Sequence, residues 1–175
     1  NGSDLRFLLA TDYQFNGDRE QAVIEVKEAR NFAPDHVKTL YDLAEIYSAD
    51  TDETSQTQRK TYLEQLVNFA PGNIVPQLQL TELLIHEGDA DKALERLEVI
   101  KKQFPEFPRE AVEYYDETLS LLKKGEPGKA EIPFTIFHNY IKVTFPYQAG
   151  INELKGPGGS NIGFPLITYN RQLTE

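Results

Sequence analysis

The chain has 175 residues, with 28 Asp and Glu against 18 Lys and Arg and a formal net charge of −10. A surface of this sign repels phosphate backbones, and no basic run exceeds two residues, so nucleic acid is not an expected partner. The absence of cysteine excludes disulfides, thiolate metal sites and thiol catalysis. No apolar run approaches the roughly 20 residues of a membrane-spanning helix, so we expect no span.

A short motif ending in proline recurs along the first hundred residues. It reads Phe32-Ala33-Pro34, then Phe69-Ala70-Pro71, then Phe104-Pro105, and the prolines stand 37 and 34 residues apart. Because proline cannot remain in a helix interior, each motif predicts the end of a helix. The spacing predicts successive pairs of helices over residues 3–36, 37–73 and 74–107.

Small residues and glycines support this division. Ala10 and Ala44 on the first helices, and Ala22 and Ala93 on the second, allow two antiparallel helices to approach closely. Gly17 and Gly88 are expected in the turns inside the pairs. The second pair departs from the pattern, because polar residues 48–55 lengthen its turn. It also has Arg59 or Thr61 where alanine is expected.

Over residues 3–107 the chain resembles the tetratricopeptide repeat family. The resemblance implies an all-α fold, a right-handed α-solenoid of helical hairpins. The alternative is an unrelated bundle of helical hairpins. A partial fourth unit is expected over 108–125, with a helix from Arg109 to Lys124 that Gly125 ends.

The remaining residues are expected to add helices and then an extended tail. Residues 126–128 form a break, and an apolar helix starting near Pro133 belongs to an additional helical segment over 126–155 that packs on the solenoid or on a partner. A short helix is expected over 148–154. Glycine and proline then end regular structure, which leaves residues 156–175 as the tail.

The tail carries a strand-compatible apolar run that has no strand to pair with in a helical chain. Its expected contacts with a partner are Phe164, Leu166, Ile167 and Tyr169. Residues 137–166 also look like the linker of some bacterial exported proteins, in which tetratricopeptide repeats precede an FG-GAP/UnbV-type β-propeller.

We expect no catalytic, cofactor or metal site. The three histidines stand about 50 residues apart, without the short spacing of metal ligands. Residues 125–130 are too short for a phosphate-binding loop and lack a hydroxyl after the lysine. The acidic residues 50–53 lack the central glycine and the terminal glutamate of a calcium loop.

In the tetratricopeptide family the first helix of each repeat lines a concave groove. The proline register assigns the following residues to that face: Phe7, Thr11, Gln14, Lys38, Tyr41, Glu45, Ser48, Leu78, Glu82, Ile85, Arg109, Val112 and Asp116. Their mixture of aromatic, aliphatic and charged side chains suits an extended peptide or a helix. The face lacks the basic clamp of the chaperone-docking members of the family.

The sequence therefore predicts a non-catalytic scaffold that binds a partner protein, with assembly of several copies left open. One alternative is a structural subunit of a larger complex, assembled through the apolar tail. Another is an accessory domain of a propeller or enzyme complex. The start without methionine favours a processed, exported bacterial protein in the periplasm or outside the cell, with a cytoplasmic location left open.

Overall fold

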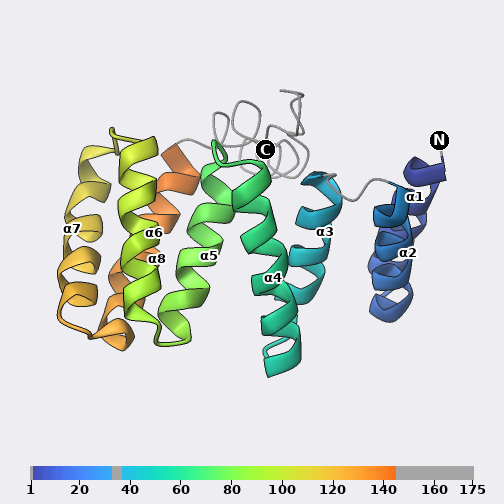
Figure 1. Cartoon of the computed structure of the whole chain (residues 1–175), viewed down its shortest axis with the longest axis horizontal. Coiled ribbons are helices and arrows are strands. Elements are labelled where there is room, and N and C mark those ends of the chain that lie inside the picture. The colour runs from blue at the N-terminus through green and yellow to red at the C-terminus, as the bar shows by residue number, and fades with distance from the viewer. Residues whose placement is uncertain (1, 33–36, 145–175) are drawn as a thin grey trace. The chain divides into compact units, whose positions relative to one another are not determined.

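The computed structural model describes residues 2–32 and 37–144, which form eight α-helices and no strands (Figure 1). The expected all-helical class is therefore confirmed for this part of the chain. The chain divides between Ala70 and Pro71 into two compact units, with α1 to α4 in unit 1 and α5 to α8 in unit 2. None of the helices in these ranges has both the length and the apolar character to cross a bilayer.

Unit 1 holds two pairs of helices. They are α1 (Gly2–Phe15), α2 (Arg19–Phe32), α3 (Val37–Ser48) and α4 (Glu53–Phe69). Helix α1 packs on α2, α2 also packs on α3, and α3 packs on α4. The expected tail 156–175, the helix 148–154 and the tail contacts Phe164, Leu166, Ile167 and Tyr169 lie outside the described residues.

Unit 2 holds α5 (Ile74–His86), α6 (Ala90–Gln103), α7 (Arg109–Lys123) and α8 (Pro127–Thr144). Each helix contacts two others, because α5 and α7 both pack against α6 and against α8. The additional segment expected after residue 126 is thus, in its described part, the second helix of a fourth pair. Part of the core of unit 2 is aromatic. The ring centroid of Phe137 lies 5.0 Å from that of Phe107, 5.5 Å from that of Tyr115 and 6.1 Å from that of Phe134.

The turns inside three of the four pairs share one backbone conformation. Gly17, Gly88 and Gly125 have φ values of 80°, 81° and 70°. Only glycine adopts this left-handed conformation without steric cost, which explains why it ends α1, α5 and α7. The turn glycines predicted at 17 and 88 are confirmed, and Gly125 makes the same turn in the fourth pair.

The second helices also share a register of buried positions. Three positions, spaced four and then three residues apart, face the first helix of the pair: Ala22, Val26 and Ala29 in α2; Arg59, Leu63 and Leu66 in α4; Ala93, Leu97 and Ile100 in α6; and Ala130, Phe134 and Phe137 in α8. Every one is at most 1% exposed except Arg59, which is half-buried. Ala22 and Ala93 are therefore buried, as small residues at a close contact between helices must be, and of the two alternatives Arg59 and Thr61 it is Arg59 that stands at the equivalent position in α4.

The start of α8 differs from the prediction. The helix begins at Pro127, six residues before the predicted start near Pro133, which instead lies inside it. Proline fits the first helical position because the amide there has no partner within the helix. Pro133 costs α8 one backbone hydrogen bond to the carbonyl of Lys129, and its buried ring packs within unit 2.

Candidate functional site

Helices α2, α3 and α4 surround an open depression of about 530 Å³ in unit 1. Five of its lining residues come from successive turns of α2, and α3 and α4 contribute one each: Arg19, Glu20, Val23, Ile24, Lys27, Tyr47 and Ser55. The depression therefore combines two cations, one carboxylate, two aliphatic side chains, one aromatic ring and one hydroxyl within reach of a single ligand.

The cations of the depression lie against the face of one tyrosine. The guanidinium carbon of Arg19 is 5.5 Å from the ring centroid of Tyr47, and the ammonium of Lys27 is 5.9 Å from it. Tyr47 stacks on Tyr62 at 5.9 Å, and Arg30 lies 5.7 Å from the Tyr62 ring. Each cation over a ring at an exposed site contributes about 0.5–1 kcal/mol. These contacts hold α2 against α3 and α4 and fix the positions of the positive groups.

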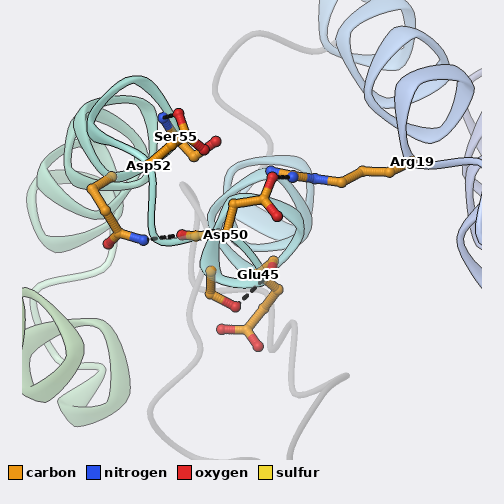
Figure 2. Close-up of polar contacts among 7 residues, drawn as sticks. Arg19, Glu45, Asp50, Asp52 and Ser55 are labelled. Atoms are coloured by element: carbon orange, nitrogen blue, oxygen red, sulfur yellow. Dashed lines mark hydrogen bonds and ion pairs between the residues drawn. The ribbon is translucent and has the colours of Figure 1, made fainter.

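The loop between α3 and α4 supports this arrangement (Figure 2). Arg19 forms an ion pair with Asp50, and the side-chain amide of Gln56 donates to the carbonyl oxygen of Asp50. Asp52 caps α4 by accepting from the backbone N–H of Ser55 at 3.0 Å. Hydrogen bonds from the side chain of Ser55 and from its backbone N–H lower the pKa of Asp52 from its ordinary value. Both aspartates are thus engaged in holding the loop.

The depression offers apolar surface beside a cation, and no histidine lines it. Ile24 is 43% exposed and Val23 half-buried, so they offer an apolar floor beside the Lys27 ammonium. Ser55 is 7% exposed and its lining neighbours include no histidine to act as its base. Among residues 2–32 and 37–144, no three acidic or histidine side chains converge as metal ligands.

In unit 1 the face predicted on the first helices is partly accessible. Thr11, Gln14 and Ser48 are exposed and Glu45 is half-buried, whereas Tyr41 is only 8% exposed. Tyr41 therefore belongs to the core of the unit. The side chains of Phe7 and Lys38 lie outside the described part of the structure.

In unit 2 the same face is largely closed. Leu78 and Ile85 are each 1% exposed, because α5 is packed against both α6 and α8. Glu82 keeps 41% of its side chain exposed and lies 3.6 Å from Nδ1 of His138 on α8. Leu78 and Ile85 are packing residues, and a partner has no access to them in this structure.

The predicted face of the fourth pair is out of register by three residues. The turn glycines align Thr118 with Thr81, which makes Val112, Tyr115 and Leu119 the counterparts of Val75, Leu78 and Glu82. The shift arises because α7 is two residues longer than α5 and the connection before it, 104–108, is one residue longer than 70–73. Arg109, Val112 and Asp116 are all exposed, but none of them is the counterpart of Leu78, Glu82 or Ile85 on α5.

The depression was not among the predicted sites, because partners were expected on the first helices and on the tail. The signal was present in α2, where Arg19, Val23, Lys27 and Arg30 follow the spacing of one helical face. Comparison with models of known protein families gives no match. The curated proteins compared with the chain give no match either.

Proposed function

We propose that this chain is a tetratricopeptide-type scaffold, an α-solenoid of helical hairpins that binds a partner polypeptide and catalyses no reaction. The observation that supports the proposal is the common register of the four pairs. The equivalent positions Ala22, Arg59, Ala93 and Ala130, of which the three alanines are buried, stand 37, 34 and 37 residues apart. These intervals equal the tetratricopeptide period of 34 residues, with three residues added twice.

The proposed binding place is the depression between α2, α3 and α4. Lys27 offers a charge for an acidic side chain, Ile24 offers apolar surface, and Tyr47 offers the edge of a fixed ring. A segment in which an acidic residue lies next to an aliphatic or aromatic one satisfies all three. The net charge of −10 opposes binding of an acidic segment over much of the molecule, and Lys27 supplies a local positive charge in the depression.

Selection from a peptide library displayed on phage, with the whole chain immobilised, tests the proposal. We expect the selected peptides to pair Asp or Glu with a neighbouring aliphatic or aromatic residue. Fluorescence anisotropy of these peptides measures their dissociation constants. We expect the constant to be about tenfold larger for Lys27→Glu, because the substitution turns attraction of the acidic peptide residue into repulsion. Lys123→Glu, on the exposed surface of α7, is the matched control and should bind as the unaltered chain does. Peptides that bind Lys27→Glu undiminished would refute the depression as the site.

A further inference from the structure

A pair of stacked tyrosines occurs in each unit of the chain. In unit 1 the rings of Tyr47 on α3 and Tyr62 on α4 have centroids 5.9 Å apart and planes inclined by 21°. In unit 2 the rings of Tyr114 on α7 and Tyr140 on α8 have centroids 5.8 Å apart and planes inclined by 19°. The two stacks therefore have nearly the same geometry. We call the pair in unit 2 the α7–α8 stack.

The cations around the two stacks differ. In unit 1 the side chains of Arg19 and Lys27 lie over the ring of Tyr47, and that of Arg30 lies over the ring of Tyr62. Within the part of the chain that the structure describes, no lysine or arginine lies over either ring of the α7–α8 stack. One tyrosine pair thus has its cations supplied by the chain itself, and the other does not.

Three glutamates of α7 lie beside the α7–α8 stack. Glu110 stands four residues before Tyr114 and Glu117 stands three after it, so both share its side of the helix. Glu113 precedes Tyr114 directly, and all three glutamates are exposed. Among the described residues, no basic side chain forms an ion pair with any of them. The other flank of Tyr114 faces the core, where Tyr115 is 5% exposed.

The α7–α8 stack is accessible to a partner. Tyr140 is 37% exposed and Tyr114 is half-buried. The face of an aromatic ring carries negative charge density and attracts a cation. Carboxylates beside the ring attract the same cation by their charge. The surface therefore combines two kinds of group that favour a positive ligand.

We propose that the α7–α8 stack, together with Glu110, Glu113 and Glu117, binds an arginine side chain in a basic segment of a partner protein. A guanidinium is planar, so it lies flat on a ring while its N–H groups donate to a carboxylate. A lysine ammonium is compact and more strongly hydrated, so it gains less from the ring. The net charge of −10 attracts a basic segment and opposes a second copy of this chain.

This surface is separate from the depression of unit 1. Helices α7 and α8 belong to unit 2 and contribute no residue to the lining of the depression. The inference therefore goes beyond the function proposed above and does not depend on a ligand in the depression. If both sites are used, the scaffold holds two polypeptide segments of opposite charge.

Fluorescence anisotropy with a synthetic peptide tests the role of the exposed ring. The probe is a labelled peptide of alternating arginine and glycine, and the whole chain is titrated into it. We expect reversible binding, with a dissociation constant about two- to fivefold larger for Tyr140→Leu, because one exposed contact between a cation and a ring is lost. Tyr140→Phe keeps the face of the ring and should bind as the unaltered chain does. Equal weakening by the two substitutions would overturn the role of the ring.

Two double variants with the same net charge test the glutamates. Glu110→Gln with Glu117→Gln should raise the dissociation constant of the peptide about tenfold. Glu64→Gln with Glu95→Gln, at exposed positions on α4 and α6, is the matched control and should raise it by less than about twofold. Equal weakening by the two double variants would mean that only the overall charge attracts the peptide, and it would overturn the site.

A second peptide tests the choice of arginine. The same sequence with lysine in place of arginine should bind the unaltered chain more weakly, because the ammonium gains less from the ring. Binding of the lysine peptide as tight as that of the arginine peptide would overturn the assignment to a guanidinium. Circular dichroism checks that each variant keeps its helix content.

Discussion

The hydroxyl of Tyr115 donates a hydrogen bond to the carbonyl oxygen of Leu97 at 3.2 Å, which joins α7 to α6. Tyr115 is 5% exposed and its ring packs against Phe107 and Phe137. Burial raises the pKa of Tyr115 to about 12, and the nearby carboxylates of Glu98 and Asp116 add to the effect. The folded state of unit 2 therefore favours the neutral phenol.

Replacing this tyrosine tests the hydrogen bond and the pKa together. At pH 7 we expect Tyr115→Phe to lower the free energy of unfolding by about 1 kcal/mol. Above the ordinary pKa of 10 the unfolded chain ionises at Tyr115 before the folded chain does, so the advantage of the unaltered protein declines between pH 10 and about 12. Urea unfolding at pH 7, 9 and 11 measures the difference. A difference that is constant over this range would contradict the raised pKa.

The turn glycines offer a test of backbone conformation. Gly88 has a φ of 81°, and no other group lies within 4 Å of the place where a Cβ would stand, so Gly88→Ala is opposed by the backbone alone. We expect a loss of about 1 kcal/mol in the free energy of unfolding. Gly128→Ala, inside α8 and equally unobstructed, is the control and should be neutral or stabilising by about 0.4–1 kcal/mol. Thermal unfolding compares the two, and equal losses would refute this explanation.

The hairpin register predicts where a larger side chain is tolerated. Ala93 is fully buried against α5, so Ala93→Leu should overpack the pair and cost about 1–3 kcal/mol. Arg59 occupies the equivalent place in α4 but is half-buried, so Arg59→Leu should change stability by less than about 0.5 kcal/mol. Chemical unfolding of both variants is the measurement. If Arg59→Leu is the more destabilising, the two positions are not equivalent.

The cap of α4 predicts an effect in acid. Because the pKa of Asp52 is lowered in the folded state, its contribution to stability is present above its ordinary pKa of 3.8 and is lost as the pH falls through the lower folded value. Asp52→Ala should therefore lower stability at pH 7, with a difference from the unaltered chain that shrinks below about pH 4. Asp52→Asn keeps an acceptor for Ser55 and is the control. Its stability should lie between the two at pH 7.

The ends of helices in this chain could be predicted where a single residue type, such as proline, excludes a helical backbone conformation. Pro71 and Pro105 each stand two residues beyond the last residue of α4 and α6. The start of α8 could not be predicted in this way, because Pro127 and Gly128 together are typical of a loop. The compensating signal was Ala130, which follows Gly125 at the same interval as Ala93 follows Gly88. A comparison of turn positions among the pairs would have placed the fourth second helix correctly.

The accessible face was harder to predict, because exposure depends on which helices meet. Leu78 and Ile85 lie at face positions by sequence register, but α5 has two packing partners rather than one. The prediction for α7 failed for a different reason, because a longer connection and a longer helix shift its register by three residues without changing the helix pattern. The depression in unit 1 also joins residues of three helices, and the pattern of a single helix cannot reveal such a combination.

The contact between α5 and α8 has a consequence for synthesis of the protein. The first and last helices of unit 2 are separated by two others along the chain, so α5 emerges from the ribosome long before α8. The pairs α1–α2 and α3–α4 can close as soon as they are made, because their partners are sequence neighbours. The apolar side of α5 stays open until residue 144 has been translated and released from the exit tunnel. During that interval the nascent chain exposes an apolar surface that chaperones can bind. Translation that stalls or stops before residue 144 therefore yields a product that is prone to aggregate.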